Sequence, residues 1–164
     1  MLIGILSDTH NDTNNIQKAL QIFSKHKPEK LIFCGDATTI ESIEWFIEYQ
    51  IIYTYGNGDF ATGEIGSFLK AYNPLNYAGF SFEGYLENKY IGVTHGHLEE
   101  HLNNMQQSGK FDYIFTGHTH MRMDKYYGKT NVINPGSLGG LKKQSRSVAL
   151  LDLISDELVF EIID

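Results

Sequence analysis

The sequence predicts an α/β protein in which two β-sheets pack face to face and helices cover them. In the first third of the chain, apolar runs of strand length alternate with segments of helical periodicity, which indicates a parallel sheet with right-handed crossovers. In the last third, strand-like runs follow one another across short turns, which indicates an antiparallel or mixed sheet. The composition suits a buried core, since 41% of the residues are hydrophobic and 13% are aromatic.

Apolar runs and their boundaries predict three strands and two helices in the first part of the chain. Leu2–Leu6 ends abruptly in polar residues, as a buried strand does. Asp12 or Thr13 can cap the first helix, and Pro28 ends it. The buried face of the second helix is expected to include Trp45. The expected bounds are Leu2–Leu6, Asp12–His26, Lys30–Cys34, Ile40–Tyr49 and Gln50–Tyr55.

The rest of the chain is predicted to be richer in strands. From Phe60 to Tyr85 aromatic residues are spread among glycines without a clean period, and they suit core packing, a cover over a cleft or an oligomer contact. Within this stretch we expect a short helix near Ile65–Ala71 and a strand over Gly79–Tyr85. The later elements are expected over Tyr90–Thr94, Leu98–Gln107 (a helix), Asp112–Thr116, Arg122–Tyr127, Thr130–Asn134, Ser147–Leu153 and Glu157–Ile163.

Length and composition also bound the class of protein. A chain of 164 residues is expected to form one domain over residues 1–164. It holds no run of about 18 apolar residues and no charged-then-apolar leader, so neither a membrane span nor export is expected. The single cysteine, Cys34, cannot form an internal disulfide and lies in an apolar run, which favours a buried thiol in a reducing cytoplasm.

The charge distribution favours binding of cations over binding of nucleic acid. A formal net charge of −7 opposes contact with duplex nucleic acid, which needs a basic surface. Basic residues are scattered, with only a mild cluster at Lys142, Lys143 and Arg146. The histidines are concentrated instead, because five of the seven fall in three short segments. These five are His10, His95, His97, His118 and His120.

Five of the expected strands end in polar turns that carry metal-binding side chains. Ligands of open α/β sheets bind outside the carboxyl ends of the strands, so all five turns can face one cleft. Carboxylate, amide and imidazole groups without a thiolate suit divalent manganese, iron, zinc, nickel or magnesium. The turns are Asp8-Thr9-His10, Gly35-Asp36, Gly56-Asn57-Gly58-Asp59, His95-Gly96-His97 and Gly117-His118-Thr119-His120.

Each turn also has a plain structural interpretation. Asp8 and His10 point the same way if their strand continues, but an Asp at a strand end is often a cap or a turn residue. Asn57-Gly58 between apolar flanks is typical of a type I′ hairpin. Two imidazoles directly after a strand, His118 and His120, serve no packing purpose, so metal binding is favoured there.

Taken together and in this order, the five motifs resemble those of the calcineurin-like metallophosphoesterase superfamily. The later segment Asn134-Pro135-Gly136-Ser137 is similar to one in the small, uncapped phosphodiesterase branch of that family. The resemblance runs from end to end of the chain. It implies a four-layer α/β/β/α sandwich, two mixed β-sheets flanked by helices, with a binuclear metal centre.

The resemblance also implies which residues hold the two ions. Mn²⁺ is the first expectation, with Zn²⁺, Fe²⁺, Ni²⁺ or Mg²⁺ as alternatives. Asp36 would bridge the two ions. The first would be held by Asp8, His10, Asp36 and His120, and the second by Asp36, Asn57, His95 and His118.

Such a centre suits the hydrolysis of a small phosphate ester. Two divalent ions about 3.5–4 Å apart can clamp phosphate oxygens and hold a hydroxide in line for attack. Many phosphatases of the family have a His directly after the motif Asn57, but this chain has Gly58, so Asp59 has no such His to orient. We therefore expect a phosphodiesterase that favours good leaving groups, with Asn57 and His97 as its catalytic residues.

Two other functions are weighed against this one. The retromer subunit of the same fold resembles a phosphoesterase but works as a protein scaffold, and it departs from the full ligand set. All seven matching ligand positions are filled here, which favours an enzyme. A DNA nuclease of the superfamily is weakened by the acidic balance and by the lack of an appended DNA-binding domain.

Overall fold

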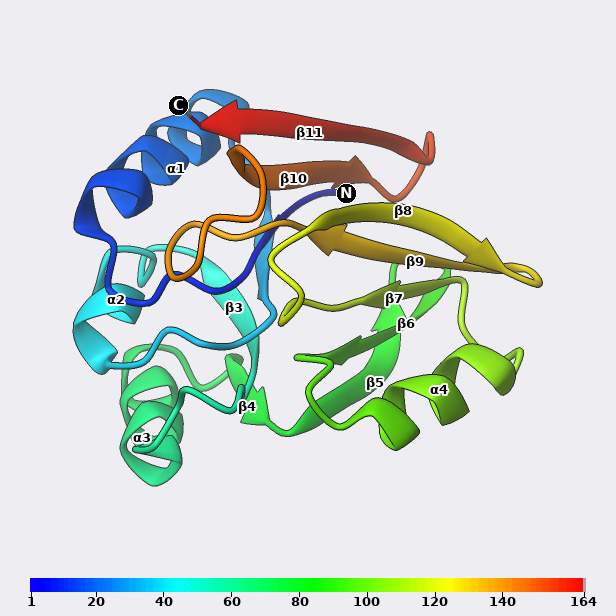
Figure 1. Cartoon of the computed structure of the whole chain (residues 1–164), viewed down its shortest axis with the longest axis horizontal. Helices are drawn as coiled ribbons and strands as arrows, with labels where there is room; N and C mark the ends of the chain where they lie inside the picture. Colours follow the sequence, from blue (N-terminus) through cyan, green and yellow to red (C-terminus); the bar gives the residue numbers. More distant parts are fainter. Residues whose placement is uncertain (164) are drawn as a thin grey trace.

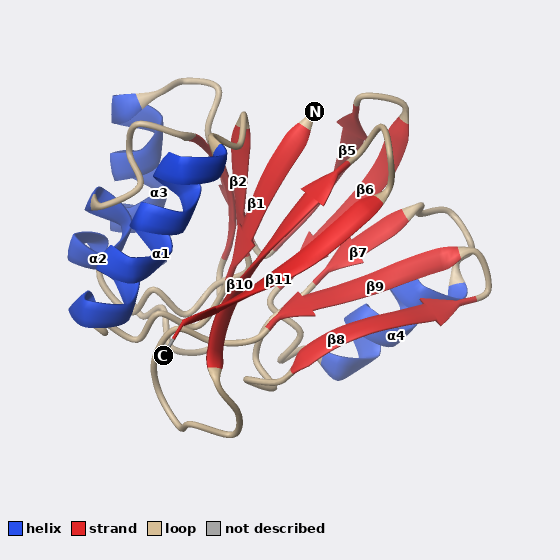
Figure 2. Ribbon diagram, turned by 90° about the horizontal axis from the view of Figure 1, so that it is seen from above, coloured by secondary structure: helices blue, strands red, loops and turns tan. Residues whose placement is uncertain are grey.

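In the computed structural model, which describes residues 1–163, two β-sheets face each other and helices cover their outer surfaces (Figures 1 and 2). The helices are α1 (Thr13–His26), α2 (Ile40–Glu44), α3 (Thr62–Tyr72) and α4 (Glu99–Gln107). Figure 2 shows α1, α2 and α3 on one side of the sandwich and α4 on the other. This arrangement confirms the four-layer α/β/β/α fold that was expected.

The first sheet has six strands in the order β11-β10-β1-β2-β3-β4. β1, β2, β3 and β4 run parallel, β10 is antiparallel to β1, and β11 is antiparallel to β10. The strands are β1 (Leu2–Leu6), β2 (Lys30–Phe33), β3 (Gln50–Thr54), β4 (Tyr77–Gly79), β10 (Arg146–Asp152) and β11 (Glu157–Ile163).

The second sheet has five strands in the order β5-β6-β7-β9-β8. β6, β7 and β9 are parallel, and antiparallel β5 and β8 form its edges. Both sheets are therefore mixed, as the family resemblance implied, because the late strands β10 and β11 join the sheet that the sequence pattern indicated to be parallel. The strands are β5 (Ser81–Leu86), β6 (Lys89–Thr94), β7 (Tyr113–Phe115), β8 (Arg122–Tyr127) and β9 (Thr130–Pro135).

Three apolar clusters hold the layers together. Alternate residues of β1 supply two of them: Ile3 and Ile5 lie between the sheets, whereas Leu6 faces the helices. Phe23 of α1 belongs to the cluster on the helical side, and a third cluster around Met105 packs α4 on the second sheet. Burial on both faces explains why the central strands are continuous apolar runs.

The second helix is shorter than predicted. It ends at Glu44 rather than Tyr49, and short turns follow. Trp45 is 39% exposed, so its expected place on the buried face was wrong. Successive side chains of a helix are about 100° apart around its axis. Trp45 therefore points away from the face on which Ile43 and Phe46 are buried. Phe46 is buried as expected.

The predicted strand over Gly79–Tyr85 is in fact two strands. β4 ends at Gly79 in the first sheet and β5 begins at Ser81 in the second, so the chain passes between the sheets at Phe80. The other expected elements have the type that was predicted, with ends displaced by at most three residues. Among residues 1–163, no helix is long and apolar enough to cross a membrane.

Candidate metal centre

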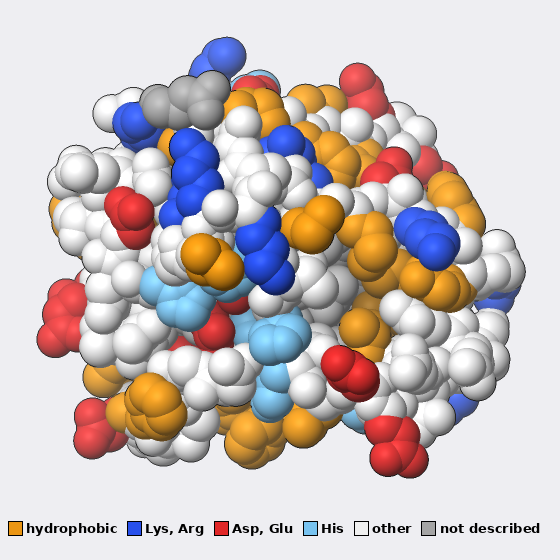
Figure 3. Space-filling view, viewed as in Figure 1, with side chains coloured by type: hydrophobic (Ala, Val, Ile, Leu, Met, Phe, Trp, Pro, Cys, Tyr) orange, Lys and Arg blue, Asp and Glu red, His pale blue; other side chains and the backbone are white. Residues whose placement is uncertain are grey.

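The loops that follow β1, β2, β6 and β7 bring five of the predicted ligands into one cluster. Asp8 and Asp36 come from the first sheet, and His95 and His120 come from the second. His10 follows Asp8 on the loop that leads into α1. Figure 3 shows histidine and acidic side chains together on this face of the molecule. The centre thus lies where the carboxyl ends of strands from both sheets meet.

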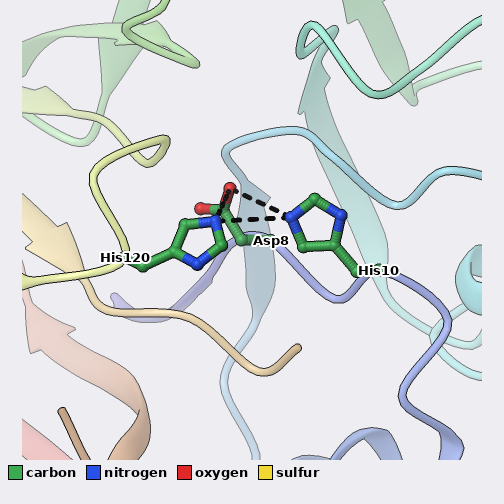
Figure 4. A group of neighbouring side chains, drawn as sticks. All are labelled: Asp8, His10 and His120. Carbon is green, nitrogen blue, oxygen red and sulfur yellow. Dashed lines mark hydrogen bonds and ion pairs between the residues drawn. The ribbon is translucent and has the colours of Figure 1, made fainter. Parts of the chain in front are cut away.

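Asp8, His10 and His120 form the first group of ligand atoms (Figure 4). His120 Nε2 lies 3.2 Å and His10 Nε2 3.7 Å from Asp8 Oδ1. The two Nε2 atoms are 3.4 Å apart. All three potential ligand atoms lie within 4.8 Å of one another, which is close enough for one ion to contact each of them.

Asp8, Asp36 and His95 form the second group. His95 Nε2 is 3.4 Å from Asp36 Oδ2 and 3.9 Å from Asp8 Oδ1. Asp36 Oδ2 is also 3.6 Å from His10 Nε2. Asp8 is therefore common to both groups, and Asp36 lies near a histidine of each. The two groups of ligand atoms are therefore adjacent and form one centre.

The backbone at the ligand positions adopts a conformation that side-chain-bearing residues rarely occupy. Asp8, His10, Asp36, His118 and His120 all have φ between 42° and 66°. The sequence suggested that Asp8 and His10 converge along a continuing strand, but β1 ends at Leu6. A left-handed turn brings them together instead. Such backbone strain clusters at functional sites, where it aims side chains that a regular strand would direct elsewhere.

Backbone carbonyls fix the orientation of two of the imidazoles. His95 Nδ1 contacts the carbonyl oxygen of Cys34 at 2.6 Å, and His120 Nδ1 contacts that of Leu141 at 2.8 Å. A proton on Nδ1 completes each bond and leaves Nε2 with a free lone pair directed at the carboxylates. This is the arrangement by which proteins set the tautomer of metal-binding histidines.

Asp59 organises the loop that carries Asp36. Its Oδ2 accepts hydrogen bonds from the backbone N–H of Asp36 at 3.0 Å, from that of Gly56 at 2.8 Å and from the Tyr53 hydroxyl at 2.7 Å. Its Oδ1 accepts one from the N–H of Thr38 at 2.9 Å. The sequence predicted only that Asp59 lacks a histidine to orient. The structure gives it another role, the positioning of two loops of the centre.

The Gly56–Asp59 turn is not the hairpin that Asn57-Gly58 suggested. β3 is followed by α3, and neither Asn57 nor Gly58 has the positive φ of a type I′ turn. The N–H of Gly58 donates to Asp36 Oδ1 at 2.7 Å. A Cβ on Gly56 would lie 2.0 Å from the same oxygen. Both glycines therefore let the backbone approach the Asp36 carboxylate.

The remaining predicted residues lie around the cluster. The side chains of Asn57 and His118 are exposed, and His118 belongs to neither group of ligand atoms. The His118 ring packs 5.2 Å from that of His95, while its backbone N–H donates to Asp8 Oδ2 at 3.0 Å. The ring of His97 is 5.4 Å from that of His95. The ligand roles of Asn57 and His118 stay predictions.

Sequence reasoning named parts of the loop of residues 136–145 but missed that this loop, which connects β9 to β10, borders the first group. A Cβ on Gly140 would lie 2.6 Å from His10 Cδ2 and 2.7 Å from His120 Cε1. The buried Arg146 guanidinium donates to the carbonyl oxygens of Gly139 and Gly140, at 2.5 Å and 2.7 Å. The adjacent glycines were the available signal, because paired glycines often mark a close backbone approach.

The carboxylates and imidazoles shift one another's pKa values. Burial alone would raise the pKa of Asp8, but the adjacent imidazoles of His10, His120 and His95 outweigh burial and hold that pKa well below its usual range. The pKa of Asp36 is lowered in the same way, since His95 outweighs burial. Burial would lower the pKa of His95, but Asp36 and Asp8 raise it. The centre is therefore an anionic site that favours positive charge.

The residues present fit divalent cations. Asp8 Oδ1 and His95 Nε2 are buried and lack a hydrogen-bond partner among the described residues. Orphaned buried polar atoms are costly and uncommon, and a coordinated cation would satisfy both of these. Carboxylate oxygens and imidazole nitrogens are also the ligands that such cations take in catalytic sites. The Asp and His groups of this centre are thus able to bind metal.

Comparison with known proteins agrees with this chemistry. A family model described as a calcineurin-like phosphoesterase superfamily domain matches residues 1–156. Phosphodiesterase MJ0936 of Methanocaldococcus jannaschii is 34% identical over 154 residues, which cover 93% of each chain. A solved structure described as a novel archaeal phosphodiesterase has a TM-score of 0.93 and 33% identity, covering 99% of this chain and 100% of that one.

The fold is also shared with Vps29, a protein whose name does not describe it as a phosphoesterase. A single mutant of Vps29 from Entamoeba histolytica has a TM-score of 0.73 and 20% identity, covering 100% of this chain and 99% of its own. At that level of identity the likeness shows the fold alone.

Proposed function

The chain belongs to the calcineurin-like phosphoesterase superfamily, and on this premise we propose that it hydrolyses phosphodiesters with two divalent cations. The adjoining ligand groups of the centre carry the proposal. A single mononuclear site would need only one such group, whereas here Asp8 belongs to both, and Asp36 Oδ2 lies 3.6 Å and 3.4 Å from the Nε2 atoms of His10 and His95. A pair of carboxylates between histidines suits a pair of cations.

The proposed ligands are those that the family motifs indicate, with Asp36 as the bridge, whereas the two groups of ligand atoms themselves share Asp8. Asp8, His10, Asp36 and His120 would hold the first cation, and Asp36, Asn57, His95 and His118 the second. When bound, the cations supply Lewis acidity that stabilises negative charge on the phosphate and activates water near neutral pH. Mn²⁺ is our first choice.

The protein's own groups prepare the centre for this chemistry. Asp8 and Asp36 are ionised at neutral pH, because their pKa values lie below the usual range. Burial and the neighbouring imidazoles of His95 and His118 lower the pKa of His97, so its neutral ring is suited to accept a proton from the attacking water rather than to donate one to the departing oxygen. Gly58 leaves no histidine beside the phosphate at that point, which favours esters with good leaving groups.

The substrates we propose are small phosphate esters of the cytoplasm. The formal net charge of −7 repels duplex nucleic acid, whereas a local cationic centre attracts a single phosphate group. The name of the curated relative, a phosphodiesterase, supports diesters over monoesters.

The direct test is turnover of bis(p-nitrophenyl) phosphate and of p-nitrophenyl phosphate by the Mn²⁺-loaded protein. We expect hydrolysis of the diester, and a loss of at least roughly 100-fold in Asp36→Ala, because a bridging ligand is removed. Asp124→Ala, which removes an exposed carboxylate on β8, is the matched control. Elemental analysis should find two metal ions per chain.

Two outcomes would redirect the proposal. Unchanged turnover of every diester by His97→Ala would remove His97 from the reaction. Tight metal binding without turnover of either ester would favour a protein scaffold, the alternative that the shared fold with Vps29 keeps open.

A further inference from the structure

The loop of residues 136–145 carries two lysines to the border of the metal centre. The carbonyl oxygen of Leu141 lies 2.8 Å from His120 Nδ1, and Gly140 packs against the rings of His10 and His120. Lys142 and Lys143 follow directly in the chain, and both are exposed. Because a Lys side chain is long and flexible, an ammonium group at either position can reach the border of the centre.

The position of this loop is determined by buried contacts. Arg146 donates to the carbonyl oxygens of Gly139 and Gly140, at 2.5 Å and 2.7 Å. The backbone N–H of Gly139 donates to the carbonyl oxygen of Asp8 at 2.7 Å. The segment that precedes the lysines is thus anchored to the backbone of a predicted ligand. The backbone of the two lysines is consequently held near the centre.

The two lysines of the loop carry charge that no neighbouring group among the described residues pairs with. Within residues 1–163, neither Lys142 nor Lys143 has an ion pair or a hydrogen bond. Figure 3 shows Lys or Arg side chains directly beside the histidines. Two unpaired cations therefore flank a site that we propose to bind a phosphate group.

Exposed lysines commonly serve only solubility, but this chain has little need of them for that purpose. Its formal net charge is −7, so further acidic residues would increase solubility at least as well. Cations at this place create a positive field that adjoins the centre in an otherwise acidic protein. An anionic group of the substrate is the ligand that such a field attracts.

We propose that Lys142 and Lys143 form a cationic lip that selects phosphodiesters carrying a second anionic group, such as a further phosphate. The inference rests on the proposed function and adds a substrate class to it. The diester phosphate would lie at the metal centre while the second anion contacts the lysines. The lip thereby distinguishes singly charged diesters from those with an additional phosphate.

The test compares two esters that differ only in the second phosphate: thymidine 5′-(p-nitrophenyl phosphate) and its 3′-phosphorylated form. We expect the Mn²⁺-loaded protein to show a KM roughly three- to ten-fold lower for the second ester, as expected for one or two exposed ion pairs. Lys142→Gln/Lys143→Gln should bring the two KM values together, with little change in the ratio of the kcat values. Lys129→Gln, an exposed lysine of the β8–β9 turn, should keep the wild-type preference.

A binding measurement separates failure of the lip from failure of the proposed function. Calorimetry of the metal-loaded protein would compare thymidine 3′,5′-bisphosphate with thymidine 5′-monophosphate. Tighter binding of the bisphosphate that is lost in the double variant supports the lip, even if neither ester is hydrolysed. Equal affinity of the wild type for the two nucleotides, or an unchanged ratio in the double variant, overturns it.

Discussion

At the scale of single residues, Asp59 shows how a side chain outside the ligand groups can determine their geometry. It is 5% exposed, and its four hydrogen bonds reach Tyr53 on β3, Gly56 and the loop of Asp36 and Thr38. A carboxylate is suited to this task, because it accepts several hydrogen bonds and donates none. Asp59 alone therefore accepts hydrogen bonds from three backbone N–H groups that would otherwise each need another acceptor.

Asp59→Asn tests this role directly. The amide keeps one acceptor oxygen and presents an NH₂ group to backbone N–H donors, so buried donors lose their partners. We expect the free energy of unfolding in urea to fall by about 1–3 kcal/mol. We also expect Mn²⁺ affinity to fall roughly 10- to 100-fold in calorimetric titrations, as for other residues that position metal ligands.

The matched control is Asp156→Asn, which weakens an exposed ion pair between Asp156 and Lys89 at 2.7 Å and keeps an amide oxygen to accept from the Tyr113 hydroxyl. Its effect on stability should stay below about 1 kcal/mol, with metal affinity unchanged. Equal losses in the two variants would contradict the role assigned to Asp59.

The sequence was sufficient to find the cluster but not the means by which it forms. Asp8, Asp36 and His95 were recognisable because metal-binding residue types follow apolar runs, a local pattern. The left-handed turns at Asp8 and Asp36 were not, because no glycine marks those positions. The contacts of Asp59 and Arg146 were equally hidden, since their partners become neighbours only after the strands have assembled.

At the scale of elements, the connections differed from expectation more than the strands did. The central strands are buried on both faces, so each is a continuous apolar run that can be recognised in the sequence alone. The division at Phe80 left no such signal, because the residues on both sides of the crossing are equally apolar and aromatic. The shortened α2 has a similar cause: its last apolar residues pack in turns rather than in a continued helix.

The loop between β9 and β10 is the connection with the clearest consequence for the centre. Arg146 contacts Gly139 through Nη1 and Gly140 through Nη2, a fork that a lysine cannot reproduce. Arg146→Lys should therefore lower Mn²⁺ affinity roughly 10-fold, because the carbonyl of Leu141 no longer holds His120 in place. Calorimetric titration measures the affinity, and urea unfolding shows whether the fold is retained.

Arg122→Lys provides the comparison for that variant. Arg122 bonds Ser145 and Ser147 through the single nitrogen Nη1, so one ammonium group can replace it. We expect Mn²⁺ affinity close to that of the wild type. If Arg146→Lys also binds Mn²⁺ with wild-type affinity, the loop does not position His120.

At the scale of the whole molecule, the centre connects the two sheets. Asp8 and Asp36 follow strands of the first sheet, while His95 and His120 follow strands of the second. Cations shared by these side chains would join the layers and would bind only the folded state. Binding to the folded state alone raises the free energy of unfolding by about 2.7 kcal/mol at a metal concentration 100 times Kd.

Unfolding with and without metal checks this consequence. Excess Mn²⁺ should raise the midpoint of urea unfolding, and a chelator should lower it again. Cys34 offers a second measurement, because its thiol is fully buried and burial raises its pKa well above the usual value. Thiol labelling should be slow and slower still with Mn²⁺. Identical unfolding curves for the metal-loaded and metal-free protein would show that the ions do not join the sheets.

The pairing of β10 with β1 determines the order in which the fold can be completed during synthesis. β1 lies between β2 and β10, so one of its edges has no partner until residues 146–152 have been made. All strands of the second sheet precede β10 in the chain and can assemble earlier. The nascent protein therefore carries an open, apolar strand edge until β10 has been made, which is the feature that chaperones recognise and that promotes aggregation. A chain that ends before β10 would keep this edge permanently.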